Sequence, residues 1–133
     1  MKSYRDAGVD IDRGDRFVDF IRSIRSPAVD GGIGGFSSAM PLEALGMRSP
    51  VLMTTTDGTG TKLLVAKSLG RWDTIGIDLV AMNVNDLVVC GARPLVFLDY
   101  IACGRIDEDR LHQVVRGIVR GCESADCSLG GGE

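Results

Sequence analysis

The stretch Thr-Thr-Thr-Asp-Gly-Thr-Gly-Thr-Lys, residues 54–62, decides how this chain is organised. The apolar run Val51-Leu52-Met53 leads into it, and helix-forming residues follow it as far as Leu69. This order predicts a strand over Val51–Thr56, a tight turn, and a helix over Lys62–Leu69 that Gly70 ends. The two glycines of the turn allow tight backbone conformations and let main-chain N–H groups approach a ligand closely.

The composition of this turn favours a nucleotide-phosphate site. The start of the following helix carries unpaired N–H groups, which bind anions. Asp57 offers a carboxylate for a metal ion, and Lys62 offers a cation for phosphate. An ordinary strand-to-helix turn with a helix cap uses the same residue types, so both interpretations stay open at this point. The stretch is not a Walker A loop, and Gly32-Ile33-Gly34-Gly35 is not a dinucleotide motif because position 37 is Ser.

Length and charge exclude several classes of protein. The 133 residues suit one domain with a proper core. The 15 basic and 18 acidic residues give a net charge of −3, which offers no electrostatic basis for binding nucleic acid or an anionic membrane. No apolar run approaches the roughly 20 residues that a bilayer requires, and no signal sequence is evident at the start. We expect a cytoplasmic protein with neither a nucleic-acid nor a membrane partner.

The four cysteines, at positions 90, 103, 122 and 127, form no C-x-x-C pair, and the lone His112 lies in no ligand-like spacing from them. Three of them sit among apolar neighbours, so we predict reduced structural thiols. His112 falls off the apolar stripe of its helix, which predicts a surface residue rather than a catalyst.

The remaining pattern predicts an α+β fold with a four-stranded mixed or antiparallel sheet and helices on one face. The bare face of such a sheet needs a cover, either a second subunit or a further domain. The predicted elements are an extended arm over residues 1–11, a helix from an Asp12 cap to Arg25, strands at Phe36–Met40 and Val51–Thr56, helices at Lys62–Leu69 and from an Asp73 cap to Cys90, a strand at Leu95–Ala102, a helix from Ile106 to about Cys122, and a strand from Cys127 into Gly130-Gly131-Gly132-Glu133.

Two further stretches are candidates for a ligand site. The glycine-rich residues 30–35 suit a flexible connector or a mobile flap whose amides fold over phosphates. In the helix over 73–90, Asp78, Asn85 and Asp86 share one side, and no Lys, Arg or Glu occurs from Thr74 to Cys90. Small acids amid apolar residues stay ionised at low cost only beside a metal or a cation. A site-facing cluster and an ordinary polar face are both open.

Taken together, these stretches resemble the N-terminal half of the aminoimidazole ribonucleotide synthetases (phosphoribosylformylglycinamidine cyclo-ligases), a family of purine-biosynthesis enzymes. The resemblance covers essentially all 133 residues with its motifs in the same order. The motifs are Ser-Tyr-Arg-Asp-Ala-Gly-Val-Asp at 3–10, Gly-Gly-Ile-Gly-Gly-Phe at 31–36, Asp-Gly-Thr-Gly-Thr-Lys at 57–62, Asp-Thr-Ile-Gly-Ile-Asp-Leu-Val-Ala-Met at 73–82, Asn-Asp-Leu at 85–87, Gly-Ala-Arg-Pro at 91–94 and Phe-Leu-Asp-Tyr at 97–100.

The resemblance implies an ATP-dependent ring closure. ATP phosphorylates the amide oxygen of formylglycinamidine ribonucleotide, a nitrogen attacks the activated carbon, and phosphate leaves. By position, the resemblance implies catalytic roles for Asp57, Lys62 and Asp86, and Mg²⁺ ligands at Asp57, Asp86 and Glu133. It implies an ATP site that comprises Gly32, Gly34, Gly35, Asp57, Gly58, Gly60, Thr61, Lys62 and Asp78, the last as a second-shell or structural residue.

The same resemblance implies a homodimer in which the sheets of two subunits pair into a barrel. The wider superfamily, which includes selenophosphate synthetase and thiamine-monophosphate kinase, uses this half for ATP. The chain departs from the family in having Gly130 where a β-branched residue usually precedes Gly-Gly-Glu. The family also continues past this glutamate into a Thr-Ala-Glu-Met-Pro segment and a C-terminal domain. We expect a truncated chain that is inactive alone; a non-catalytic dimerisation scaffold is the alternative.

Overall fold

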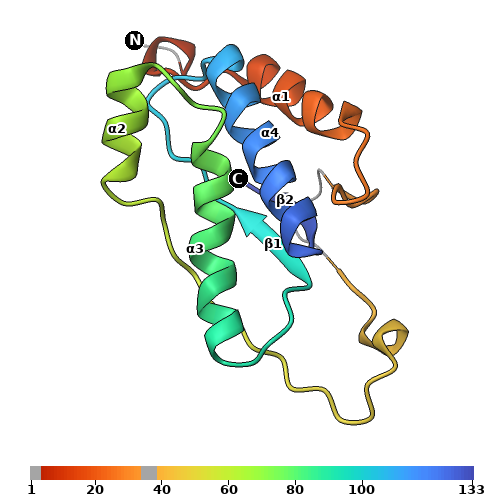
Figure 1. Ribbon diagram of the computed structural model, residues 1–133. Coiled ribbons are helices and arrows are strands. Elements are labelled where there is room, and N and C mark those ends of the chain that lie inside the picture. Colours follow the sequence, from red (N-terminus) through yellow and green to blue (C-terminus); the bar gives the residue numbers. More distant parts are fainter. Residues whose placement is uncertain (1–3, 34–38) are drawn as a thin grey trace.

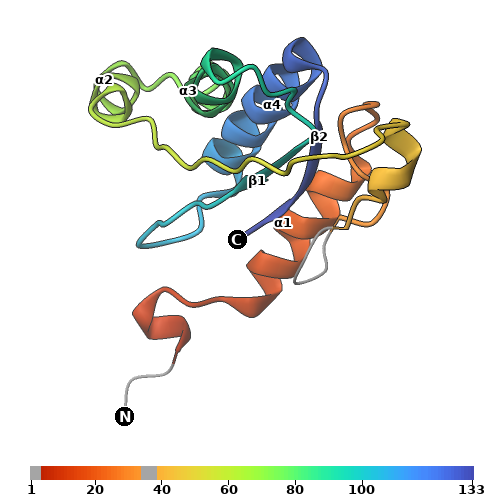
Figure 2. The same ribbon diagram turned by 90° about the horizontal axis from the view of Figure 1, so that it is seen from below.

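The structure, a computed structural model, describes residues 4–33 and 39–133 and has an α+β fold (Figure 1). Helix α4 packs against α3 on one side and α1 on the other. Figure 2 shows α2 and α3 on the side away from α1, with α4 and the strands between them. The elements are η1 (Arg5–Ala7), α1 (Ile11–Ser23), η2 (Leu42–Leu45), α2 (Lys62–Leu69), α3 (Ile75–Val89), β1 (Val96–Asp99), α4 (Glu108–Ala125) and β2 (Ser128–Gly132).

The sheet of the described residues has two strands, β1 and β2, which run parallel. Helix α4 connects them. Two parallel strands need such a crossover, because the chain must return to the end of the sheet where the first strand began. Phe97 pairs with Leu129 and Leu98 with Gly131, so Gly130 is the extra residue of a bulge. The unusual glycine before Gly-Gly-Glu therefore lies where the ladder is interrupted.

The predicted four-stranded mixed or antiparallel sheet is wrong for the described part of the chain. Residues 51–56 form no strand, and Val51 and Leu52 are 85% and 70% exposed. The apolar run Val51-Leu52-Met53 predicted a strand, but in the described residues no neighbouring strand pairs with this segment. Of the other predicted strand, 36–38 lie outside the described residues, and 39–40 form no strand.

The helix ends differ from the predicted ends by one to three residues. Asp10 rather than Asp12 caps α1, where its carboxylate accepts a hydrogen bond from the Arg13 amide at 3.2 Å. The predicted extended arm therefore ends before Ile11 and contains η1. Asp73 does not cap α3, which begins after Thr74; its carboxylate instead pairs with Arg71 at 3.0 Å. The Lys62–Leu69 helix and its Gly70 end are confirmed.

The core is built where α3 crosses α4. Gly76 on α3 faces the α4 backbone so closely that an added Cβ would overlap the Val114 carbonyl oxygen and the Ile118 amide. Gly117 on α4 faces Gly76 in turn, so the two helices approach through their glycines. The fully buried side chains beneath this crossing are Val80, Val115, Ile118, Cys122 and Leu129.

His112 and the cysteines lie partly where the sequence indicated. His112 is half-buried, stacked on Phe20 with ring centroids 3.7 Å apart, so its assignment to the free surface is wrong. It falls off the α4 stripe because it faces α1 instead. All four cysteines are free thiols; Cys122 and Cys127 are buried, whereas Cys90 and Cys103 are exposed.

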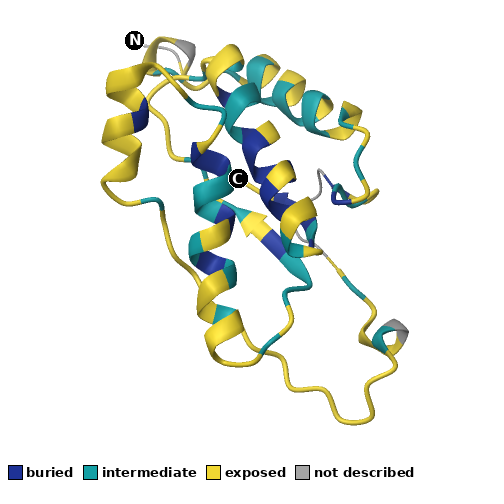
Figure 3. Ribbon diagram, in the orientation of Figure 1, coloured by how far each residue is buried: buried dark blue, intermediate teal, exposed yellow. Residues whose placement is uncertain are grey.

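The long connection from residue 39 to α2 contains η2 and is exposed along most of its length (Figure 3). Among the helices that the structure describes, none is long and apolar enough to cross a bilayer.

Candidate functional site

The connection returns to the body of the protein at Asp57, where Asn83 of α3 binds its main chain. The Asp57 amide donates to Asn83 Oδ1 at 2.8 Å, and Asn83 Nδ2 donates to the Asp57 carbonyl at 3.1 Å. Asn83 Nδ2 also donates to the Leu79 carbonyl one helical turn away, at 2.9 Å. Asn83 is the buried polar side chain of the core, 9% exposed, and its amide is saturated by these bonds.

Two more contacts flank this pair. Thr55 Oγ1 donates to Asp86 Oδ2 at 3.3 Å, and Lys62 Nζ lies 3.6 Å from Asp78 Oδ1. Successive residues of the segment contact successively earlier residues of α3: Thr55 contacts Asp86, Asp57 contacts Asn83, and Lys62 contacts Asp78. The segment 55–62 therefore runs antiparallel to α3 and is fixed to it at three points.

The turn between these contacts is polar and open. The Asp57 carboxylate accepts a hydrogen bond from the Gly58 amide at 2.7 Å. Gly60 has a left-handed φ of 56°, which a residue with a side chain adopts only at a cost. Thr61 precedes α2 without a side-chain cap, so its hydroxyl does not occupy the N–H groups that begin the helix. The amides of Leu63 and Leu64 in the first turn already donate to the carbonyls of Gly60 and Thr61, at 3.3 and 3.0 Å.

The glycine-rich stretch is only partly described. The Gly32 amide donates to Asp30 Oδ1 at 2.7 Å, and Ile33 is buried against the core. Gly34 and Gly35, which the sequence predicts to contact ATP, lie outside the described residues.

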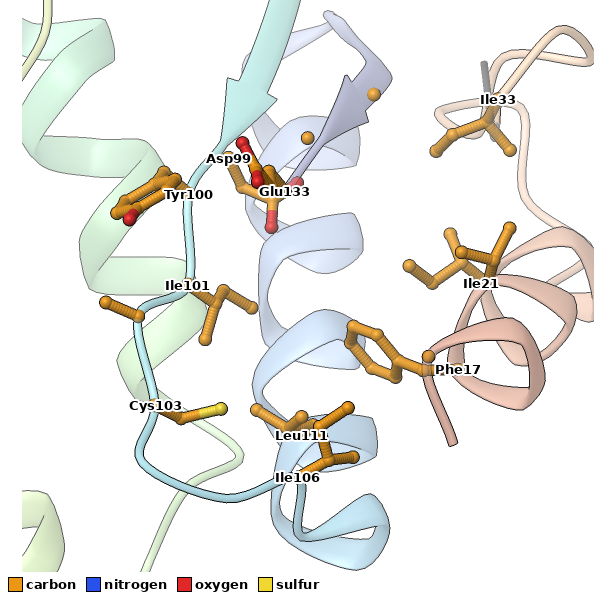
Figure 4. Close-up of a pocket in the computed structure, with 15 residues that line it drawn as sticks. Phe17, Ile21, Ile33, Asp99, Tyr100, Ile101, Cys103, Ile106, Leu111 and Glu133 are labelled. Carbon is orange, nitrogen blue, oxygen red and sulfur yellow. The ribbon is translucent and has the colours of Figure 1, made fainter. Parts of the chain in front are cut away.

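Glu133 lies elsewhere, at the end of β2. Its amide donates to the Asp99 carbonyl at 3.1 Å, and its own carbonyl accepts from the Ile101 amide at 2.6 Å, so the pairing continues past the strand ends. Its side chain reaches the mouth of a cavity of about 550 Å³, where it lies beside Asp99 (Figure 4). Burial raises the pKa of the Asp99 carboxyl to about 6.

The walls of this cavity are apolar. Phe17 and Ile21 of α1 face Ile101, Ile106 and Leu111 across it (Figure 4). None of the residues that contact α3 from segment 55–62 lines this cavity. The metal-ligand candidates are therefore divided between two places. Asp57 and Asp86 lie along a polar edge of α3, whereas Glu133 lies at a separate, mainly apolar cavity.

The described residues contain no group of three His, Cys, Asp or Glu side chains that could hold a metal ion. Asp57 and Asp86 lie along the same edge of α3. Asn83 of α3 binds the Asp57 main chain, and Thr55 binds the Asp86 carboxylate. Among the described residues, Glu133 makes its main-chain hydrogen bonds with Asp99 and Ile101 and none with Asp57 or Asp86. Lys62 and Asp78, both 46% exposed at the side chain, are brought together as an ion pair.

Sequence reasoning missed Asn83. It lies three residues after Val80 and four before Leu87, both on the apolar face of α3. A polar amide at that position on an otherwise apolar stripe was the available signal, because a buried amide must find hydrogen-bond partners.

Comparison with known proteins shows the family of this chain. A family model described as "AIR synthase related protein, N-terminal domain" matches residues 45–133, which include segment 55–62, α3, both strands and Glu133. The chain belongs to the AIR synthase related protein family. Its matched part begins within the connection, ten residues before segment 55–62.

Individual relatives agree with the family. The chain is 56% identical, over 98% of its length, to phosphoribosylformylglycinamidine cyclo-ligases of Anaeromyxobacter sp. (strain K) and Aromatoleum aromaticum, and covers 39% and 38% of them. It is 50% identical to a bifunctional purine biosynthetic protein of Schizosaccharomyces pombe, of which it covers 17%. The chain therefore spans about 39% of the length of the cyclo-ligase relatives it matches.

Proposed function

We propose that this chain is the ATP-binding part of a phosphoribosylformylglycinamidine cyclo-ligase. The observation that carries the proposal is the three-point attachment of segment 55–62 to α3. It fixes the segment that carries Asp57 and Lys62 along the edge of α3 that carries Asp78 and Asp86. The relatives that carry the cyclo-ligase name are 56% identical over 98% of this chain, which supports transfer of that activity.

Each group of this edge has a role in binding ATP. The ammonium of Lys62 pairs with phosphate oxygens, and the amides that precede Leu63 at the start of α2 donate to the same anion. We propose that the glycine-rich stretch that contains Gly32 contacts the triphosphate as well. Asp78 holds Lys62 in place through the ion pair at 3.6 Å.

Hard carboxylate oxygens are the ligands that Mg²⁺ prefers, and Asp57 and Asp86 present theirs in exposed positions on one edge. Asp57, Asp86 and Glu133 would hold the ion. When bound, Mg²⁺ neutralises charge on the transferring phosphoryl group. Because the three carboxylates are not gathered into a ready metal site, we propose that ATP completes the ligand set, as is usual for this ion.

The reaction requires little covalent chemistry from the protein. ATP gives its terminal phosphoryl group to the amide oxygen of formylglycinamidine ribonucleotide and leaves as ADP. A nitrogen of the substrate then attacks the activated carbon, the C–O bond to phosphate breaks, and one proton is lost as aminoimidazole ribonucleotide forms. Catalysis of such steps rests on positioning and on electrostatic stabilisation. We propose that the substrate is bound jointly with a C-terminal domain, since the relatives are longer than this chain.

We further propose a cytoplasmic homodimer in which the sheets of two subunits pair into a barrel. Leu98 of β1 and Tyr100 just after it are 60% and 73% exposed, and Val51 and Leu52 of the connection are 85% and 70% exposed. Apolar surface of this extent favours a protein partner. The same surface supports the second candidate function, a dimerisation scaffold without catalysis.

A chimera tests the proposed activity. This chain would replace the aligned 135 residues of the Anaeromyxobacter cyclo-ligase, and the product would be assayed for ATP hydrolysis dependent on formylglycinamidine ribonucleotide. The proposal predicts substrate-dependent hydrolysis that Asp86→Asn abolishes. A folded chimera without hydrolysis would favour the scaffold.

A further inference from the structure

The end of α4 brings two cysteines together. Asp126 follows the helix with a left-handed φ of 52°, and its amide donates to the Glu123 carbonyl at 3.3 Å. The Cys127 amide donates to the Cys122 carbonyl at 3.1 Å. These two bonds define a Schellman motif, in which the side chains at the positions of Cys122 and Cys127 contact each other.

Both thiols are enclosed by the core. Cys122 is 0% and Cys127 7% exposed, and both belong to the same cluster as Ile118 and Leu129. The two neighbouring thiols shift each other's ionisation: the pKa of the Cys122 thiol is raised and that of the Cys127 thiol is lowered. The pair therefore contains a better nucleophile, Cys127, with a second thiol in direct contact.

We propose that Cys122 and Cys127 are a redox-active dithiol that a peroxide closes into an intramolecular disulfide across the end of α4. The Cys127 thiolate attacks one oxygen of hydrogen peroxide, the O–O bond breaks, and hydroxide leaves as Cys127 becomes a sulfenic acid. The Cys122 sulfur then attacks the Cys127 sulfur, its proton and the departing hydroxyl form water, and the S–S bond is made. Peroxide is reduced by two electrons, which the two thiols supply.

The position of this disulfide gives it a consequence. Cys127 immediately precedes β2, and β2 pairs with β1 and leads to Glu133. A bond between Cys122 and Cys127 fixes the start of β2 to the last turn of α4. Oxidation therefore restrains the strand that leads to Glu133, a proposed metal ligand. This consequence rests on the proposed function, whereas disulfide formation itself does not.

Peptide mass spectrometry tests the proposal directly. Arg120 is the last basic residue, so trypsin releases both cysteines in one peptide, Gly121 to Glu133. The folded chain would carry Cys90→Ser and Cys103→Ser, exposed positions, so that only the buried pair remains. After hydrogen peroxide, denaturation and alkylation, we expect this peptide without alkyl groups and lighter by two hydrogen atoms. Dithiothreitol should restore two alkylated thiols.

Single variants test the order of the two steps. Cys122→Ala removes the resolving thiol, so dimedone should label Cys127 after peroxide treatment. Cys127→Ala should leave Cys122 unlabelled. Circular dichroism checks that each variant is folded. If a single variant unfolds, mass spectrometry of the chain that keeps both Cys122 and Cys127 decides whether the disulfide forms. Two alkylated thiols after peroxide treatment, or dimers linked through these cysteines, would overturn the proposal.

Discussion

Asn83 and Asp57 bind each other through two hydrogen bonds of 2.8 and 3.1 Å, although 26 residues separate them. This pair attaches the candidate phosphate segment to α3. Asn83→Ala removes both bonds and the one to Leu79, and we expect it to lower the free energy of unfolding by about 2 kcal/mol. Urea denaturation measures this loss, and Mg-ATP affinity should fall with it.

Asn85→Ala is the matched control, because Asn85 lies two residues further along the same helix and is exposed. Its effect on unfolding should stay within about 0.5 kcal/mol. If the two variants lose equal stability, Asn83 does not hold the segment.

Lys62 should matter for the ligand far more than for the fold. Its ion pair with Asp78 is half-exposed, so Lys62→Met should change the free energy of unfolding by less than about 1 kcal/mol. Loss of a charged phosphate contact should weaken Mg-ATP binding about tenfold or more. Lys67→Met, at an exposed position on the same helix, should change neither quantity. Equal Mg-ATP affinity in both variants would remove Lys62 from the site.

The crossing of α3 and α4 depends on Gly76. A methyl group there overlaps the α4 backbone, so Gly76→Ala should destabilise the protein by about 3 kcal/mol. Gly14→Ala, in the interior of α1 with open space around it, should instead stabilise by up to about 1 kcal/mol. Thermal unfolding compares the two, and a tolerated Gly76→Ala would contradict the close helix approach.

The Asp99 carboxyl predicts a pH dependence in metal-free buffer. Burial raises its pKa in the folded state from 3.8 to about 6, so the folded chain binds this proton more tightly than the unfolded chain. The contribution of Asp99 to stability is therefore greatest below about pH 4 and declines as the pH rises to about 6. Asp99→Asn should gain stability relative to the wild type across that interval, by up to about 3 kcal/mol. A difference independent of pH would contradict the burial.

Local patterns predicted the helices well and the sheet poorly. The helix Lys62–Leu69 and its Gly70 end follow from propensity and from the freedom of glycine, which both act within a few residues. A strand needs a partner, and partners are set by the whole chain. The apolar run Val51-Leu52-Met53 has the pattern of a strand but pairs with none in the described residues.

The candidate site shows the same division. Asp57, Lys62 and Asp86 stand out by residue type within their own motifs, and the contacts of their segment with α3 bring them to one edge. Asn83, which makes that contact, gave only a weak signal because its role depends on the fold. Glu133 was grouped with these residues by resemblance alone, and its neighbour in the structure is Asp99.

Calorimetric titration of the chain with Mg-ATP decides whether segment 55–62 and α3 form an ATP site. We expect saturable binding that Asp57→Asn and Asp86→Asn each weaken by about tenfold or more, through loss of a charged ligand. Asp109→Asn, at an exposed position on α4, should bind as the wild type does. A folded chain that releases no heat, or Asn variants that bind Mg-ATP as tightly as the wild type, would contradict it.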